Sequence, residues 1–262
     1  MCRKSLFLGR VAVLVGVTSP ALADLLVHYG LNETVGSVAH DSVGANDGSV
    51  SGSYWTTPGA NANTGPGCVR VGDGGTLHGT GGGPSMREFT FMFWLKGSYY
   101  DWHWIWSAGA EGNHFSFGSS IDHWEFVWNF EDPLATGGRI MSGTWQHLAF
   151  VGSGSRITVY IDGWGWGNVK VNSGLDFTEF RITSAPGHTE PFAADIDDVG
   201  LWDEALDVAT IAHYMGNGIG GSTAGCPCPG NLNTDDQIDL EDLQAVAGIL
   251  LDAGSPFIVT CE

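Results

Sequence analysis

The chain has 262 residues, of which 43% are hydrophobic and 11% aromatic, and it carries 29 acidic but only 10 basic side chains. The resulting net charge of −19 repels phosphate backbones, so we expect no nucleic-acid partner. Forty glycines alone could indicate disorder, but the aromatic residues between them can supply a folded core.

The first 23 residues have the pattern of an export signal. Arg3 and Lys4 precede a short apolar run at 11–17, and small residues at 21–23 suit cleavage. The run is shorter than the ~20 residues that a membrane span needs, so we expect no span in the mature chain; an uncleaved anchor is the alternative. Cleavage before Asp24 removes three basic residues and no acidic ones, leaving a net charge of −22 on a secreted or cell-envelope protein.

Strand signals dominate the chain from residue 24 to 215. Aromatic and β-branched residues alternate between glycine-rich turns, a pattern typical of many short strands. Asp162-Gly163 stands between two such runs and predicts a hairpin turn. A short helix is expected at 205–215, packed beneath the strands. The strongest strand signals lie at 25–29, 89–95, 104–106, 115–117, 125–129, 145–151, 157–161 and 194–202.

The composition changes after residue 215. Residues 216–228 are rich in glycine and nearly uncharged at their start, as in a flexible linker. Residues 229–262 begin with a polar, acidic stretch and continue with apolar residues at helical spacing. We therefore divide the chain into a signal segment (1–23), a strand-rich domain (24–215), a linker and a small loop-helix segment.

Several segments of the strand-rich domain together resemble the laminin G-like (concanavalin A-like) jelly-roll family of secreted bacterial proteins. The resemblance implies an all-β fold, in which two antiparallel sheets form a jelly-roll sandwich. The residues that carry it occur in the family's order: an opening strand at 26–34, a first turn at 41–48, a central strand at 89–95, the pair 144–150 and 157–163, and a closing strand running into a helix at 196–206.

The C-terminal segment resembles a single dockerin repeat, and its loop at 231–242 follows the spacing of an EF-hand. Calcium prefers oxygen ligands at these positions. Residue 236 is Asp where EF-hands have Gly, residues 252–262 hold no second loop, and a calcium-free turn that caps a helix is the alternative. A cohesin-like partner is a weaker expectation. The predicted ligands are Asn231, Asn233, Asp235, Gln237, Asp239 and Asp242.

A second calcium site is implied by the jelly-roll resemblance, because relatives often hold a structural ion near the first turn and the closing strand. Asp41, Asn46 and Asp197 are the candidate ligands here. The alternative is equally simple: Asx residues form the turn, and a hydrogen bond ends the strand. Calcium is the one cofactor that we expect.

Two aromatic segments are candidates for stacking on sugar rings. The first is Tyr99, Tyr100, Asp101 and Trp102, at the start of a loop-to-strand region whose Trp104 and Trp106 we expect in the core. The second comprises Trp164 and Trp166, whose alternate spacing after the predicted turn places them on one face of a strand. The alternative for the first segment is that Tyr99 or Tyr100 only covers an edge of the sheet, and for the second segment it is burial.

Catalytic patterns are weak in this sequence. The alternating acids Asp195 and Asp197 have the spacing of paired carboxylates, but the Glu-x-Asp-x-x-Glu pattern of sandwich glucanases is missing. We therefore expect no enzymatic activity; a polysaccharide-degrading glycoside hydrolase carried by a dockerin-like module is the alternative.

Four cysteines lie outside the signal segment, and export would permit disulfide bonds among them. Cys68, Cys226, Cys228 and Cys261 allow three complete pairings, which sequence does not distinguish. A bond from Cys261 to Cys226 or Cys228 is preferred because it would close the C-terminal segment.

These observations predict a secreted, non-catalytic recognition protein that binds a glycan or an extracellular protein. A purely structural protein of the envelope or matrix is the third alternative. An exposed aromatic surface without an adjacent pair of acids would favour glycan binding over both other classes.

Overall fold

The computed structural model describes residues 24–97, 103–110, 114–120, 123–128, 134–139, 141–187 and 193–219. Fourteen strands and one helix occupy these ranges, and every strand pairing is antiparallel. The all-β sandwich expected from the sequence is thereby confirmed. The predicted signal segment and the predicted dockerin-like segment lie outside the described residues.

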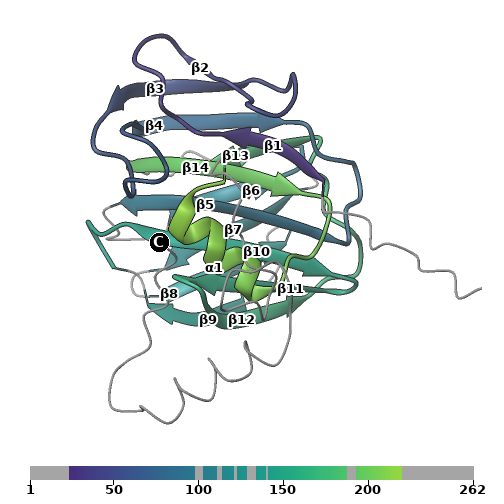
Figure 1. Cartoon of the computed structure of the whole chain (residues 1–262). Helices are drawn as coiled ribbons and strands as arrows, with labels where there is room; N and C mark the ends of the chain where they lie inside the picture. Colours follow the sequence, from purple (N-terminus) through teal and green to yellow (C-terminus); the bar gives the residue numbers. More distant parts are fainter. Residues whose placement is uncertain are drawn as a thin grey trace, which may run out of the picture.

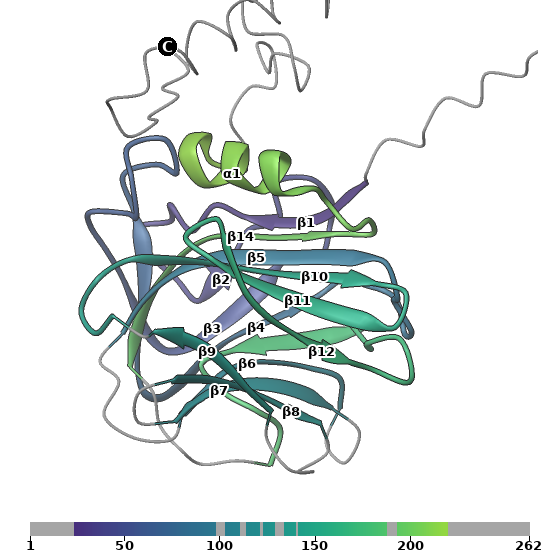
Figure 2. The same cartoon turned by 90° about the horizontal axis from the view of Figure 1, so that it is seen from below.

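The strands follow one another as β1 (Leu25–Tyr29), β2 (Val38–Ala39), β3 (Gly48–Thr56), β4 (Cys68–Thr80), β5 (Phe89–Gly97), β6 (His103–Ala108), β7 (Phe115–Ser120), β8 (His123–Trp128), β9 (Leu134–Arg139), β10 (Gln146–Ser153), β11 (Arg156–Ile161), β12 (Trp164–Lys170), β13 (Glu179–Ile182) and β14 (Ala194–Trp202), with helix α1 (Val208–Asn217) at the end. In one layer the order is β12-β11-β10-β5-β14, with β1 beside β14. The order then continues through β4 and β13 into the layer of β6, β7, β8 and β9. Figure 2 shows these two layers, with α1 outside the first.

Strand β4 connects the two layers. Its first part, Val69 to Val71, pairs with β14, and its second part, from Leu77, pairs with β13. β3 pairs with both parts, so β3 and β4 run together along one side of the molecule (Figure 1). The sequence signals missed both strands, because glycine and serine interrupt their apolar residues.

The core between the layers is largely aromatic. Phe91 of β5 contacts Trp106 of β6, with ring centroids 5.1 Å apart. Phe150 of β10 meets Phe117 of β7 at 4.7 Å. Trp106 is fully buried and Trp104 is 3% exposed, as the sequence predicted for both. Alternation along each strand produces this core, since every second side chain points between the layers.

Helix α1 covers part of the outer face of the first layer. Its residue Ile211 packs into an apolar cluster with Met92, Ala149 and Trp202, which point away from the aromatic core. Asp207 caps the helix by accepting a hydrogen bond from the backbone of Thr210 at 2.8 Å. The predicted helix is confirmed, although it begins three residues later than expected.

Candidate functional site

The β11–β12 hairpin presents two tryptophans at the edge of the first layer. Its turn is Asp162-Gly163, as predicted, and both residues have positive φ, 51° and 78°, as the tight hairpin turn requires. Trp164 is 75% exposed and Trp166 is 44% exposed. Because β12 ends the strand order beside β11, these rings lie on an edge strand.

The shared face expected for the two tryptophans is modified by a β-bulge. Gly165 pairs with Tyr160 and Gly167 with Val159, so Trp166 is the extra residue between the two pairs. A bulge of this kind redirects one side chain relative to simple alternation. Both rings are nevertheless open to solvent, and the two neighbouring glycines add no side chain that could cover them.

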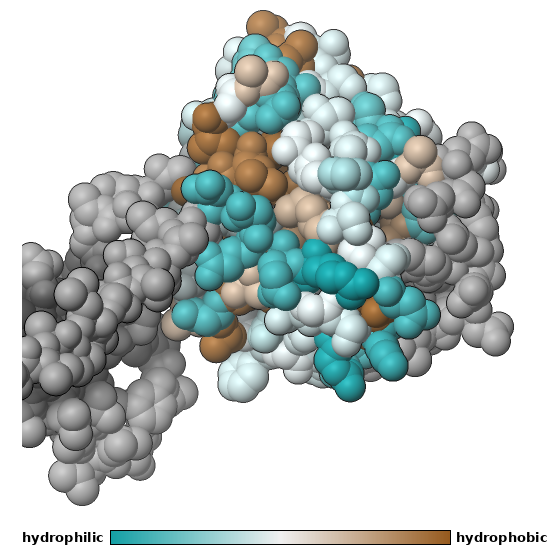
Figure 3. All heavy atoms as spheres, turned by 90° about the vertical axis from the view of Figure 1, so that its right-hand side faces the viewer, coloured by the Kyte–Doolittle hydropathy of each residue, from teal (hydrophilic) through white to brown (hydrophobic). Residues whose placement is uncertain are grey.

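Large exposed apolar side chains are few where the structure describes side chains, which excludes 119–140, and three of them are aromatic: Tyr54, Trp164 and Trp166. The face in Figure 3 is correspondingly polar or neutral over most of its coloured area, with small separate hydrophobic patches. The other predicted aromatic platform, Tyr99, Tyr100, Asp101 and Trp102, lies outside the described residues. Of the two predicted platforms, the hairpin with Trp164 and Trp166 is the one within the described residues.

The first turn brings Asp41 and Asn46 together. One carboxylate oxygen of Asp41 accepts the backbone N–H of His28 at 3.1 Å and of Val43 at 3.2 Å, and the other accepts that of Asn46 at 3.1 Å. Tyr29 donates its hydroxyl proton to the Asn46 carbonyl at 2.6 Å. The carboxylate of Asp41 thus already holds the turn together through three backbone donors.

Asp198, the neighbour of Asp197, is the acid that connects the closing strand with the first turn. One of its oxygens lies 2.8 Å from Nε2 of buried His28, and the other accepts the backbone N–H of Ile219 at 2.9 Å. Asp198 has φ +50°, within a register shift of β14. Ile196 and Val199 both point into the core, so this bulge leaves the two consecutive acids between them outside it, where each finds a different partner.

Asp197 instead binds the loop between β3 and β4. Its Oδ2 accepts the backbone N–H of Ala60 and the hydroxyl of Thr64, both at 2.7 Å. Burial raises the pKa of Asp197 to about 7, against the opposing effect of these two bonds. Oδ1 is buried without a hydrogen-bond partner. Asp197 and Asp41 share no partner, so hydrogen bonds do not assemble the trio Asp41, Asn46 and Asp197.

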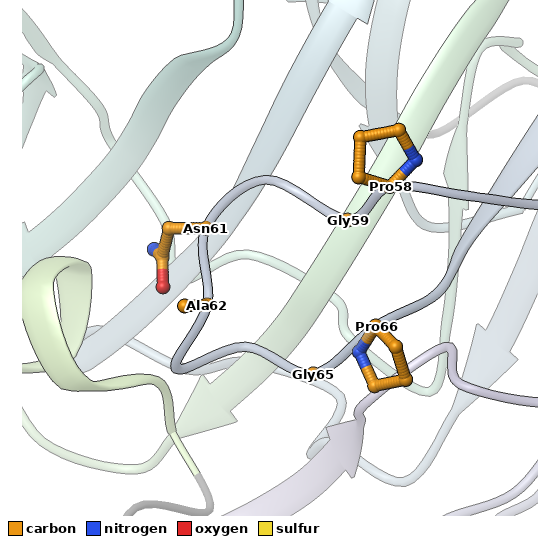
Figure 4. A pocket seen from close by; sticks show the side chains of 6 residues that line it. All are labelled: Pro58, Gly59, Asn61, Ala62, Gly65 and Pro66. Carbon is orange, nitrogen blue, oxygen red and sulfur yellow. The ribbon is translucent and has the colours of Figure 1, made fainter.

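The same loop forms a pocket lined by Pro58, Gly59, Asn61, Ala62, Gly65 and Pro66 (Figure 4). Its tip is tied to the C-terminal end of α1, since Asn61 and Asn63 donate side-chain hydrogen bonds to the carbonyls of Met215 and Gly216. At its base, a Cβ on Gly59 would lie within 2.8 Å of three oxygens: those of Gly65 and Gly67 and Oδ2 of Asp197. The close approach of these oxygens requires glycine at position 59.

The two oxygens of Asp197 differ in their surroundings. Oδ2, which already accepts two hydrogen bonds, approaches the same point beside Gly59 as the carbonyl oxygens of Gly65 and Gly67, whereas Oδ1 is buried without a partner. Within the described ranges, no group of three or more His, Cys, Asp or Glu side chains could hold a metal. A cation at Asp197 would therefore depend on carbonyl oxygens. The predicted terminal ligands, Asn231, Asn233, Asp235, Gln237, Asp239 and Asp242, lie outside the described residues.

Cys68 is buried beside this loop as a free thiol, and its Sγ lies 3.5 Å from the carbonyl oxygen of Pro58. Burial and the nearby carboxylates of Asp195 and Asp197 raise its pKa to about 12. A thiol of this kind is a poor nucleophile at neutral pH, because almost none of it is thiolate. Cys226, Cys228 and Cys261 lie outside the described residues.

One arrangement of side chains escaped the sequence analysis. Tyr54 pairs with Arg70 across β3 and β4, Arg70 pairs with Asp195, and Asp195 pairs with Lys96. The ammonium of Lys96 lies 5.0 Å from the ring centroid of Trp145, just before β10. We call these five residues the cross-strand row. No local motif could reveal it, because it combines single residues from five separate segments.

The acids on β14 are engaged in structural contacts. Asp195 accepts a bond from Arg70 at 2.7 Å on one oxygen and lies 2.9 Å from the Lys96 ammonium with the other. Asp197 lies under its loop, and Asp198 bonds to His28. Asp195 and Asp197 share one face of β14 but lie in two different environments, because different segments cover them. Within the described part of the chain, no helix has the length and apolar character required to cross a membrane.

Solved structures with a similar fold are found at low sequence identity. A sialidase from Trypanosoma rangeli, solved with sialic acid, matches at a TM-score of 0.56 and 17% identity over 72% of this chain, which spans 32% of the sialidase. Domain 4 of an extracellular arabinanase from Geobacillus stearothermophilus, solved with arabinotriose, matches at 0.53 and 17%, over 73% of this chain and 98% of that domain.

The binding domain of Paraclostridial Mosquitocidal Protein 1 matches at a TM-score of 0.57 and 12% identity, over 73% of this chain and 52% of that one. Identities this low establish a common fold and nothing further. A search of curated proteins found no match. The family model described as the concanavalin A-like lectin/glucanases superfamily matches residues 72–212, more than half of the chain. The chain therefore belongs to the concanavalin A-like lectin/glucanases superfamily.

Proposed function

We propose that this protein is secreted and binds a glycan without cleaving it. The observation that carries the proposal is the pair of exposed rings, Trp164 and Trp166, on the edge hairpin of a concanavalin A-like sandwich. Indole faces stack on the apolar faces of sugar rings, and burying two such rings would release much ordered water. Two structural neighbours, one solved with sialic acid and one with arabinotriose, are consistent with a glycan ligand.

Polar groups on the hairpin supplement the stacking surface. Asn168 follows Trp166 on β12, and its side-chain oxygen accepts a hydrogen bond from Arg156 on β11. The amide nitrogen of Asn168 and the remaining guanidinium donors of Arg156 can face sugar hydroxyls. Apolar rings with a few fixed polar groups are the usual composition of a binding surface for small ligands.

The surroundings of the three acids on β14 support a non-catalytic role. Most glycoside hydrolases use two carboxyl groups, about 5–9.5 Å apart, that both reach the substrate. Asp195 is bonded to two cations, Asp197 is covered by its loop, and Asp198 is bonded to His28. A release of reducing sugar from any bound polysaccharide would instead favour the glycoside hydrolase alternative.

Calcium is proposed as a structural ion at two places. One is the loop at Asp197, where Oδ1 has no hydrogen-bond partner and Oδ2 lies near the carbonyl oxygens of Gly65 and Gly67; the other is the dockerin-like segment, where Asp242 is the twelfth residue of the loop. Calcium should raise the melting temperature of the sandwich, and Asp197→Asn should abolish this increase while Asp242→Ala leaves it intact. An equal calcium response in wild type and Asp197→Asn would exclude the sandwich site.

The glycan proposal is tested by screening the full chain on a glycan array, with calcium and with EDTA. The double variant Trp164→Ala/Trp166→Ala should lose binding by more than tenfold, because each stacked ring contributes about 1 kcal/mol or more. Val35→Ala is the matched control: this side chain is 82% exposed, and its removal should leave binding unchanged. If wild type binds no glycan under either condition, the proposal is wrong and a structural role in the envelope becomes the better explanation.

A further inference from the structure

The cross-strand row is a second ordered surface on the first layer. Tyr54, Arg70, Asp195 and Lys96 face one another directly in the register of four neighbouring strands, and Trp145 follows beside Lys96. Neighbouring strands are ~4.8 Å apart, so the five positions extend over roughly 19 Å. The order of groups is aromatic, cation, anion, cation, aromatic.

The row points outward. The residues on either side of it in the strands, among them Val69, Val71, Leu95 and Ile196, belong to the core between the layers. Alternation therefore directs Arg70, Lys96 and Asp195 to the outer face. On that face α1 covers Met92, four residues before Lys96, and the helix does not extend over the row.

Arg70 and Lys96 present N–H donors of the row to solvent. Asp195 has a side chain that is only 7% exposed, and each of its oxygens already faces a cation. The side chains of Arg70 and Lys96 are 37% and 29% exposed, and their remaining N–H groups are free to bind acceptors. Two cations around one anion leave a local charge of +1, in a chain whose net charge is −19.

The two ends of the row offer aromatic surface. Tyr54 is 62% exposed at one end, and the half-buried ring of Trp145 lies at the other, with the Lys96 ammonium over it. Sugar rings can stack at both ends while an acidic substituent between them meets the guanidinium and the ammonium. Asp197, two residues from Asp195 on β14, is bonded to the loop that covers it, and salt screens more distant negative charges beyond about 8 Å under physiological conditions.

We propose that the cross-strand row binds an acidic glycan, whose carboxylate groups bond to Arg70 and Lys96 while its rings stack on Tyr54 and Trp145. This inference rests on the proposed glycan-binding function and adds a second surface and a ligand class. The hairpin tryptophans lack this charge pattern, so the two surfaces have separate ligands. The ion pairs of Asp195 keep both cations fixed in position before the ligand arrives.

The test compares polygalacturonate with its fully methyl-esterified form, which keeps the sugar backbone and removes the charge. Titration calorimetry with the full chain should show binding to the acid and at least tenfold weaker binding to the ester, because a charge-assisted hydrogen bond is lost at each cation. Lys96→Gln should weaken binding to the acid about tenfold, and Tyr54→Ala about fivefold. Higher salt should weaken binding of the acid alone.

Arg87→Gln is the matched control for charge. Arg87 is exposed just before β5, nine residues from Lys96 at the opposite end of that strand, and its loss changes the net charge as Lys96→Gln does. The inference is wrong if Arg87→Gln weakens binding as much as Lys96→Gln, or if acid and ester bind equally. Trp164→Ala/Trp166→Ala should retain binding to the acid. If wild type binds neutral glycans but not the acid, the row is excluded and the proposed function stands.

Discussion

The two faces of strand β5 differ in what covers them. Phe91, Phe93 and Leu95 point inward into one continuous core. On the outer face, Met92 lies in the apolar cluster with α1, Trp94 packs against His147, and Lys96 belongs to the cross-strand row. One strand of nine residues therefore has a uniform inner face and an outer face divided into three environments.

Because of this difference, inner-face side chains contribute mainly to stability, whereas outer-face side chains are available for binding. The inner face is closed by the second layer, so each of its side chains contributes mainly through burial and packing. The outer face is covered in succession by a helix, by packed polar and aromatic side chains, and by solvent, so its polar groups either need partners or are free to bind ligands. Substitutions on the two faces should therefore have different consequences.

The largest loss of stability should come from a substitution on the inner side of the sandwich. Trp106→Ala removes a fully buried ring that contacts Phe91, Phe115 and Phe150, and should lower the free energy of unfolding by about 3–5 kcal/mol. Trp164→Ala is the matched control on the open edge and should change it by less than about 0.5 kcal/mol. Chemical denaturation followed by circular dichroism measures both. Similar losses for the two variants would contradict the assignment of the faces.

Should Trp106→Ala fail to fold, Trp106→Phe offers a milder version of the same test. It keeps an aromatic ring in the core and removes an indole N–H that has no partner. We expect a loss of about 1–2 kcal/mol, still above that of Trp164→Phe.

An intermediate effect on the free energy of unfolding should come from the titration of His147, which lies on the outer face and is 2% exposed. Burial lowers the pKa of its imidazole to about 3, and Nδ1 has no partner. Between about pH 6.5 and 3 the unfolded chain binds a proton that the folded chain does not. The free energy of unfolding should therefore fall as the pH falls through this window, by about 1.4 kcal/mol per pH unit from this residue.

His147→Phe removes this titration and keeps a ring against Trp94, whose centroid lies 5.2 Å from that of His147. The difference in unfolding free energy between wild type and His147→Phe, measured from pH 7.5 to pH 5, isolates the contribution of the imidazole from that of the carboxylates. A constant difference over this range would show that His147 titrates normally in the folded protein.

The smallest effect on stability should come from the cross-strand row. Asp195→Asn removes the charge that Arg70 and Lys96 share, but both cations are partly exposed and can be hydrated. We expect a loss of about 1 kcal/mol. The same variant should weaken binding of polygalacturonate, since the cations lose their fixed positions. Thermal unfolding and calorimetry on one preparation separate the two effects; a loss above about 3 kcal/mol would identify the row as a structural element.

The fold was largely predictable because its strongest strands carry local patterns. The alternation at 89–95, the hairpin turn at Asp162-Gly163 and the closing strand at 194–202 all appear in the structure. The sequence patterns missed β4, because Gly72, Gly74 and Gly75 have no side chain that could show alternation. This segment is a strand because it pairs with β3, β13 and β14.

The candidate sites were less predictable. Sequence identified Trp164 and Trp166 as a possible platform, but their exposure depends on an edge position and a bulge. It grouped Asp41, Asn46 and Asp197 by analogy, whereas the bulge in β14 directs Asp198 toward His28 and Asp197 toward Ala60 and Thr64. Local spacing cannot anticipate a bulge, because the register depends on the neighbouring strand.

By itself, the sequence determined the class of fold and the members of the aromatic core, since a period of two along a strand decides which side chains share a face. Only the tertiary structure decided what covers each outer position. Asp195 and Asp197 illustrate this: their spacing places both on one face of β14, but one meets Arg70 and Lys96 while the other is buried under the loop after β3. The partners come from segments more than 90 residues away, and pairing across the sheet, with no local signal, brings them together.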